Sequence, residues 1–112
     1  MALPKNHRLV LTGKITALLR GKGRRIQTNL FTAFYLPGNT SLASRFAVIV
    51  GAYLSKKAVL RNRIRRIVQE AIRFSLPKTR GIDMIVYPKK KSLEVSTKDV
   101  RKNAEFLLQK IA

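Results

Sequence analysis

The stretch "SKKAVLRNRIRRIVQEAIRF", residues 55–74, decides the fold because it combines a run of basic residues with a repeat of apolar residues. Between Lys56 and Arg66 it has six cations and no acid. Its apolar residues nevertheless recur at helical spacing and predict one dry face on a helix spanning about residues 56–75. These apolar residues are Leu60, Ile64, Ile67, Ala71 and Phe74. The stretch therefore predicts a helix that buries one stripe against a sheet and presents a cationic outer surface.

Shorter patterns on both sides of this helix predict the rest of the fold. The expected elements are, in chain order, a helix at 12–20, strands at 30–36 and 45–53, the 56–75 helix, a strand at 82–87, and a last helix with its apolar stripe from Val100 to Ile111. The first helix has an apolar stripe at Leu11, Ile15, Leu18 and Leu19, and "STKD", residues 96–99, predicts a capping box for the last one. We expect "GKGRR", residues 21–25, to be a basic loop. Helices that follow strands predict an α+β domain, a two-layer sandwich on a sheet of three to four strands.

Length and charge narrow the class of protein. The 112 residues suffice for one domain, which we expect over residues 1–112 with an extended segment at 1–10. The chain has 24 Lys and Arg against 5 Asp and Glu, a net charge of +19, and no acid before Glu70. Like charges repel in a compact state, so a polyanionic partner is expected. Nucleic acid is favoured over a membrane because no apolar run approaches a spanning length.

The absence of cysteine and of a signal-peptide pattern further limits the chemistry and the location expected for the protein. The chain has no cysteine, which excludes disulfides and thiolate chemistry. The N-terminal residues lack the apolar run of a signal peptide, so we expect a cytoplasmic protein. We expect neither a small-molecule substrate nor a firmly bound cofactor, and the oligomeric state stays open.

The outer face of the 56–75 helix is the predicted nucleic-acid contact. An arginine fork pairs with two phosphate oxygens and also stacks on bases. Asn62 is suited to reading a 2′-hydroxyl or to orienting an arginine. A helix face that is merely solvated usually mixes charges of both signs, and this one has no acid until Glu70. The residues predicted to bind RNA are Lys56, Lys57, Arg61, Asn62, Arg63, Arg65, Arg66, Gln69 and Arg73.

Catalysis by the protein itself is not expected. Its five acids are scattered over different predicted elements, whereas metal-dependent nucleases gather carboxylates around one or two ions. The only histidine, His7, lies in the predicted N-terminal segment. No catalytic or metal-binding residue is therefore predicted. Among the aromatic residues, Phe34 and Tyr87 are expected to be accessible for base stacking.

The chain resembles the protein subunit of bacterial ribonuclease P in three stretches. They are "LPKNHRL" at residues 3–9, "KKAVLRNRIRR" at 56–66 with the arginine-rich RNR signature of that family, and "GIDMIVYP" at 81–88. Length and element order also match. The resemblance implies an α/β sandwich with a left-handed βαβ crossover through the RNR helix.

The same resemblance implies a function. The enzyme of that family is a ribonucleoprotein that removes the 5′ leader from precursor tRNA. A large RNA carries the Mg²⁺-dependent chemistry, and the protein binds that RNA and the leader. The family implies that Arg61, Asn62, Arg63, Arg65 and Arg66 face the RNA. It also implies a leader groove between the sheet and the RNR helix, which would involve Ile15, Leu19, Phe34, Tyr53 and Tyr87.

Departures from the family pattern concern the leader groove. Ile15 and Leu19 stand where the family usually has phenylalanines, and Ala52 and Tyr53 stand where many members have a lysine pair. Tyr87 replaces an arginine, and Gln69 replaces a common basic residue. We therefore hypothesise that this protein depends more on contacts with the RNA subunit than on contacts with the leader.

Three alternatives remain open at this point. A generic RNA-binding structural protein, such as a small ribosomal component, fits the composition and the helix equally well. A protein-only nuclease is disfavoured by the scattered acids. A duplex-DNA binder is disfavoured because no helix-turn-helix pattern is evident.

Overall fold

The computed structural model describes residues 8–9, 12–36, 44–75 and 81–110. Most of the predicted N-terminal extended segment lies outside these residues, as do Leu11, His7 and Ile111. The elements in chain order are α1 (Gly13–Lys22), β1 (Arg24–Gln27), β2 (Phe31–Leu36), β3 (Arg45–Val48), α2 (Ala58–Ser75), β4 (Asp83–Pro88), the short 3₁₀ helix η3 (Lys90–Leu93) and α3 (Thr97–Gln109).

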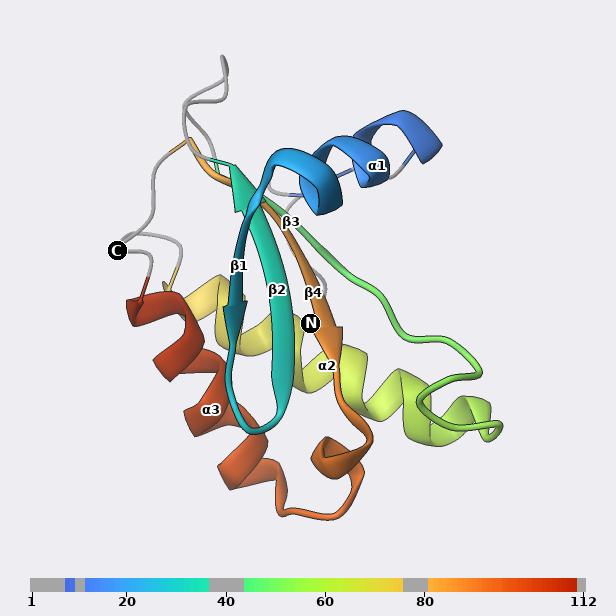
Figure 1. Cartoon of the computed structure of the whole chain (residues 1–112). Helices are drawn as coiled ribbons and strands as arrows, with labels where there is room; N and C mark the ends of the chain where they lie inside the picture. Colours follow the sequence, from blue (N-terminus) through green and yellow to red (C-terminus); the bar gives the residue numbers. More distant parts are fainter. Residues whose placement is uncertain (1–7, 10–11, 37–43, 76–80, 111–112) are drawn as a thin grey trace.

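The four strands form one sheet in the order β1-β2-β4-β3. β2 pairs antiparallel with both β1 and β4, whereas β3 and β4 run parallel. Helix α2 joins these parallel neighbours and lies behind the sheet in Figure 1, where both strands run downward and β4 lies to the left of β3. The crossover is therefore left-handed, against the strong general preference for right-handed connections.

The two faces of the sheet are covered differently (Figure 1). Helices α2 and α3 cover one face, where alternate strand residues such as Phe31, Met84 and Val86 enter the main core. The opposite face carries a smaller cluster around Leu19 of α1 and Ile85 of β4. Because side chains alternate along a strand, β2, β3 and β4 contribute to both clusters, whereas β1 packs only Ile26, against the main core. The predicted two-layer α+β architecture is confirmed, and α1 adds partial cover on the second face.

The buried face of α2 contains Ile64, Ile67 and Ala71 of the predicted apolar stripe, together with Val68 and Ile72. The side chain of Phe74, also in the predicted stripe, lies outside the described part of the structure. Leu60, at the first turn of the stripe, is half-buried. On α3, the N-terminal half of the predicted capping box forms, because the hydroxyl of Ser96 accepts a hydrogen bond from the backbone N–H of Asp99 at 3.2 Å.

The structure corrects three expectations. The segment expected as a basic loop, residues 21–25, instead contains the end of α1 (Gly21 and Lys22) and the first two residues of strand β1 (Arg24 and Arg25). Periodicity does not reveal β1 because three of its four side chains are exposed and only Ile26 packs against the core. Leu18 of the expected α1 stripe is 46% exposed, since α1 touches the sheet through one narrow side. Strand β3 ends at Val48 instead of residue 53, because the chain turns at residues 52–54.

An ion pair holds the parallel strands in register. Arg45 and Asp83 are partners in the β3–β4 ladder. The guanidinium group donates through Nε at 2.9 Å and through an Nη at 2.7 Å to the two carboxylate oxygens. Such a bidentate pair adds geometric specificity as well as energy. It fixes the start of both strands on the side of the sheet that α1 partly covers.

We expect Asp83→Ala to lower the free energy of unfolding by about 1 kcal/mol, because it removes a charge-assisted bidentate contact that is partly open to water. Urea unfolding of Asp83→Ala, Arg45→Ala and the double variant measures the coupling between the two side chains. Strictly additive effects of the two single variants would contradict a structural role for the pair.

Candidate RNA interface

The start of α2 is organised by its own basic residues. The Ser55 hydroxyl accepts a hydrogen bond from the backbone N–H of Lys57 at 3.1 Å. The Arg61 guanidinium donates to the carbonyl oxygens of Ser55 at 3.0 Å and of Lys56 at 3.4 Å. Arg61 is half-buried as a result, whereas Lys56 and Lys57 are exposed. Arg61 therefore stabilises the turn that carries the two lysines.

The next residues point outward from the helix. Asn62, Arg63, Arg65 and Arg66 are all exposed. The Asn62 side-chain oxygen accepts a hydrogen bond from the Arg65 guanidinium, which is the orienting role considered for Asn62 from the sequence. Arg63 lies toward the other border and donates to the Thr97 hydroxyl at 3.0 Å. Arg63 thus bridges α2 to the start of α3, and Arg65 and Arg66 are the centre of the exposed surface.

A shallow hollow of about 370 Å³ lies among Val59, Asn62, Arg65 and Arg66. Val59 is 76% exposed, the highest value among the exposed large hydrophobic residues of the described chain. An apolar side chain beside two arginines suits contact with a sugar or base edge next to a phosphate. The predicted residues Gln69 and Arg73 lie one and two turns further along α2 and are half-buried. They extend the surface at its edge.

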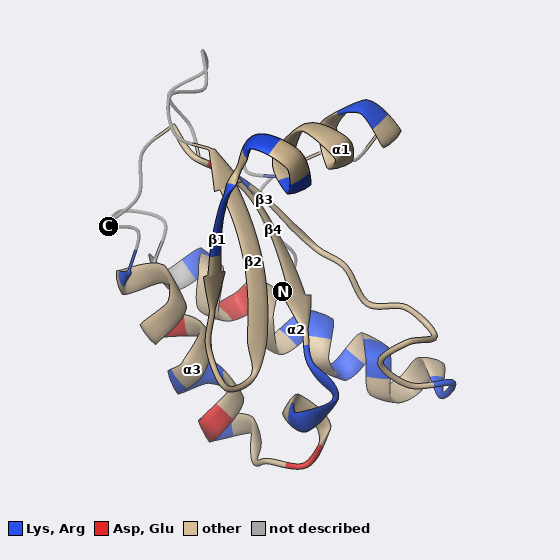
Figure 2. Ribbon diagram, viewed as in Figure 1, with Lys and Arg blue, Asp and Glu red and all other residues tan. Residues whose placement is uncertain are grey.

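Few acids counter this surface (Figure 2). Among the described residues, the ion pairs join Arg45 to Asp83 and Arg101 to Glu70, the latter at 3.8 Å. Neither pair involves the arginines at the centre of the surface. Because phosphates can replace water around unpaired guanidinium groups at little cost, the face is suited to a polyanion. We name the exposed residues Lys56, Lys57, Asn62, Arg63, Arg65 and Arg66 the basic face of α2.

The candidate leader residues occupy a different part of the molecule. Phe34 and Tyr87 stack edge to face, with ring centroids 6.0 Å apart. The Arg20 guanidinium of α1 lies 5.8 Å from the centroid of the Tyr87 ring. Ile15 packs at the margin of the same cluster, while Leu19 is only 1% exposed and supports the cluster from within. Three of the predicted residues thus meet at one half-open surface, and Leu19 is corrected to a core residue.

The resemblance implied that this groove lies between the sheet and the RNR helix, and the structure does not place these residues there. Phe34 and Tyr87 belong to the sheet face that α1 partly covers, whereas α2 packs on the opposite face. Alternation along β2 and β4 decides this, since a strand residue can serve one face only. The surface formed by Ile15, Arg20, Phe34 and Tyr87 is named the α1–sheet surface.

Tyr53 lies in the turn between β3 and α2. Its hydroxyl donates a hydrogen bond shared between the carbonyl oxygens of Ile49 at 2.9 Å and Pro88 at 3.0 Å. Burial raises the pKa of the Tyr53 phenol, and the neighbouring charge of Tyr87 raises this pKa further. The hydroxyl therefore stays protonated and tethers the turn, while Tyr53 as a whole remains 45% exposed.

Two basic residues on the α1 side of the sheet, Arg20 and Arg25, were not predicted from the sequence as site residues. Arg20 was not recognised because it is one of several exposed basic residues on a short helix. Arg25 of β1 is opposite Phe34 in the antiparallel ladder and so shares its face of the sheet. The signal that could have revealed it was the alternation in "RRIQ", which places Ile26 inward and Arg25 outward.

In the part of the chain that the structure describes, no three His, Cys, Asp or Glu side chains come together as ligands for a metal ion. Within the same residues, no helix has the length and apolar character needed to span a membrane.

Known proteins resemble this chain in sequence and in fold. The family model described as Ribonuclease P matches residues 3–112. A ribonuclease P protein component from Synechococcus elongatus is 40% identical over 75 residues, which are 64% of this chain and 61% of that protein. One from Chlamydia trachomatis serovar L2 is 33% identical over 111 residues, covering 99% of this chain and 88% of that protein. The solved RNase P protein from Thermotoga maritima aligns with a TM-score of 0.81 and 29% identity, over 94% of this chain and 97% of that one.

Proposed function

The chain belongs to the Ribonuclease P protein family, and from this membership and its basic surface we propose that it is the protein subunit of a ribonuclease P. In this role it binds the RNA subunit and the precursor tRNA and assists the endonucleolytic removal of the 5′ leader. The two classes of RNA contact fall on two sides of the domain. The protein acts without catalytic residues of its own, in the cytoplasm.

The observation that carries the proposal is the two-sided construction of α2. Ile64, Ile67 and Val68 are buried in the core. Arg65 and Arg66, between them in sequence, are exposed and have no acid partner among the described residues. This arrangement supports a contact with the phosphates of a folded RNA, because it offers several guanidinium forks on one rigid element.

The leader is assigned to the α1–sheet surface. Two aromatic rings and the guanidinium group of Arg20 lie within stacking distance there. Stacking tolerates different sequences because every base has a π face, which suits leaders that differ from one precursor to another. Single-stranded RNA on this surface and folded RNA on the basic face of α2 would then contact opposite sides of the sheet.

The chemistry of cleavage is assigned to Mg²⁺ held by the RNA subunit, as the family implies. The protein supplies positive charge near the phosphates and positions the substrate. This division of labour predicts that the protein lowers the Mg²⁺ concentration needed for cleavage, because its cations reduce repulsion between the two RNAs.

Reconstitution tests the proposal directly. The full chain is combined with a bacterial ribonuclease P RNA at low Mg²⁺, and cleavage of precursor tRNA is followed. We expect the protein to restore cleavage that the RNA alone performs poorly under these conditions. Unchanged cleavage would favour a generic RNA-binding structural protein, and cleavage without added RNA would indicate a protein-only nuclease.

The hypothesis of weak leader recognition gives a prediction for Tyr87. We expect Tyr87→Ala to weaken precursor tRNA binding to the holoenzyme by no more than about 1–3 kcal/mol, the value of stacking one base. Tyr87→Phe should keep the affinity because it retains the ring, and mature tRNA should bind all three proteins equally. Fluorescence titration with leaders of several lengths measures this, and a steep dependence on leader length would contradict the hypothesis.

A further inference from the structure

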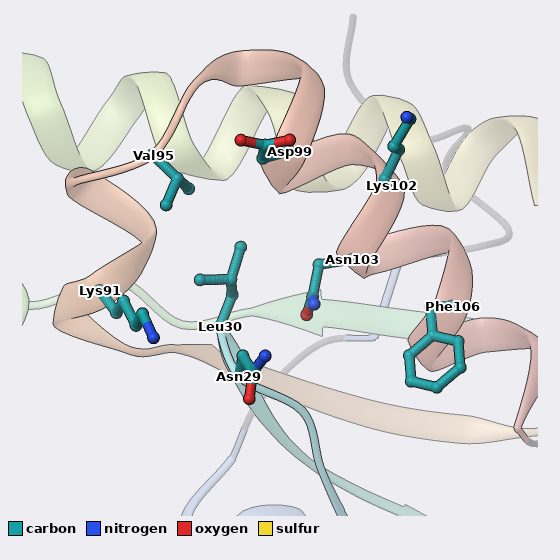
Figure 3. Close-up of a pocket in the computed structure, with 8 residues that line it drawn as sticks. All are labelled: Asn29, Leu30, Lys91, Val95, Asp99, Lys102, Asn103 and Phe106. Carbon is teal, nitrogen blue, oxygen red and sulfur yellow. The ribbon is translucent and has the colours of Figure 1, made fainter.

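A third surface lies where the β1–β2 turn meets α3, away from both surfaces described above. Two hollows adjoin there, with volumes of about 340 Å³ and 460 Å³. Both hollows are lined by Asn29, Asn103 and Phe106. Figure 3 shows side chains from the turn, η3 and α3 surrounding the first of them.

Phe106 is the most unusual feature of this site. It is 51% exposed, although the opposite side of α3 buries Ala104, Leu107 and Leu108 in the core. The ammonium group of Lys110 lies 4.9 Å from the centroid of its ring. The ammonium group occupies one face of this exposed ring, so a nucleobase can stack on the other face, with its own phosphate near the cation.

Hydrogen bonds hold the floor of the site in place. The Thr28 hydroxyl donates to the side-chain oxygen of Asn103 at 2.5 Å and accepts from the backbone N–H of Phe31 at 3.1 Å. The Lys89 ammonium group donates to the Thr28 carbonyl oxygen at 2.8 Å. With its oxygen engaged by Thr28, Asn103 has its amide NH₂ group to offer a ligand. This group is a donor at a defined position, which base recognition requires.

Charge at the site favours an anionic ligand. Four lysines line the two hollows, and a single acid, Asp99, lines the first of them. The lysines are Lys89, Lys91, Lys102 and Lys110. The second hollow has Lys89 and Lys110 and no acid. We name Asn29, Asn103, Phe106 and the four lysines the hairpin–α3 surface.

We propose that the hairpin–α3 surface binds a single-stranded RNA nucleotide, with the base stacked on Phe106, the amides of Asn29 and Asn103 toward the base edge, and the phosphates at Lys102 and Lys110. The surface contains none of the residues assigned to the RNA subunit or to the leader. It would give the protein a third RNA contact, made with an unpaired nucleotide. The proposal does not depend on the ribonuclease P role, since it concerns the isolated chain and a short oligonucleotide.

The absence of tryptophan from the chain allows a direct test. In Phe106→Trp, the only tryptophan stands on the proposed platform, and a stacked adenine quenches its fluorescence. We expect a saturable quench on titration with a short single-stranded oligoadenylate. Anisotropy of the labelled oligonucleotide should give the same affinity. Oligonucleotide binding without any change in fluorescence would overturn the proposal.

Matched variants separate stacking from simple attraction of charge. Phe106→Leu keeps an apolar side chain without a π face, and we expect it to weaken binding about 5- to 150-fold, the range measured for loss of one stacked base. Lys110→Ala should weaken binding more than Lys98→Ala, which removes the same charge from an exposed position of α3 outside the hollows.

Other occupants of the surface would give different results. Equal affinity of Phe106→Leu and the unchanged protein for oligoadenylate would reduce the site to non-specific electrostatics and overturn the proposal. So would competition by inorganic polyphosphate as strong as that by oligoadenylate. If sedimentation equilibrium showed that Phe106→Leu only abolishes self-association, the surface would be an interface between two copies of the chain instead.

Discussion

Replacing Arg65 and Arg66 together with alanine is expected to weaken binding of the RNA subunit about 100-fold, from about 1.4 kcal/mol for each lost charge-assisted contact. Both side chains are exposed at the centre of the basic face of α2. The slope of log K against log salt should become shallower by roughly 1.8, since each phosphate contact contributes about 0.9. Filter binding or anisotropy across a salt series measures both quantities.

The matched control removes two positive charges elsewhere. Lys90 and Lys98 are exposed and lie on η3 and α3, outside the basic face. Lys90→Ala with Lys98→Ala changes the net charge by the same amount, so it should alter affinity only through weak long-range attraction. Unfolding by urea should show that both double variants keep the stability of the unchanged protein. Equal losses of affinity in the two variants would show that the RNA does not contact α2 through these arginines.

Ile64→Ala is expected to lower the stability of the protein and to leave its RNA affinity unchanged, the opposite of the arginine variant. Ile64 is 1% exposed and lies beside Arg65 in the sequence, but it points into the core under the sheet. Truncating such a side chain removes buried apolar area and leaves a cavity, which costs about 2–5 kcal/mol. Because small domains are stable by only about 5–15 kcal/mol, this is a large part of the total. Urea or thermal unfolding followed by circular dichroism measures the loss.

A graded variant distinguishes a packing effect from a general disturbance of α2. Ile64→Val removes one methylene group and should cost about 0.5–1.5 kcal/mol. At low temperature, where Ile64→Ala remains folded, its RNA affinity should equal that of the unchanged protein. An Ile64→Ala variant as stable as the parent would mean that α2 does not pack through this stripe. It would contradict the claim that α2 buries one side in the core and exposes the other to RNA.

The elements with strong periodicity were predictable. The repeat of Ile64, Ile67 and Ala71 at helical spacing has one stable solution, a helix with that stripe buried, and the structure contains it. The strand around residues 82–87 is buried on both faces at Met84, Ile85 and Val86, and the apolar run that follows Asp83 indicates it. In both cases the local pattern and the tertiary packing favour the same secondary structure and the same buried residues, so the sequence is enough to predict them.

Strand β1 was not predictable by the same reasoning. As an edge strand it has one neighbour, and only Ile26 needs to be apolar. Its charged residues therefore resemble a loop, although charges are common on exposed edges of sheets. Leu18 shows the reverse error, because a leucine at helical spacing implies burial only when another element covers that side of the helix, and none of the described elements does so.

The sequence by itself determined that a cationic helix packs on a sheet, because a 3.6-residue apolar repeat and a run of arginines on one segment must face opposite directions. It also determined that Asn62, Arg63, Arg65 and Arg66 of that helix are exposed, but not that Arg61, Gln69 and Arg73 are half-buried. Only the tertiary structure decided that Phe34, Tyr87 and Arg20 meet on the face opposite α2, and that Asn29, Asn103 and Phe106 share one site. These groups come from segments distant in the chain, and their meeting depends on strand order and register, which local periodicity does not encode.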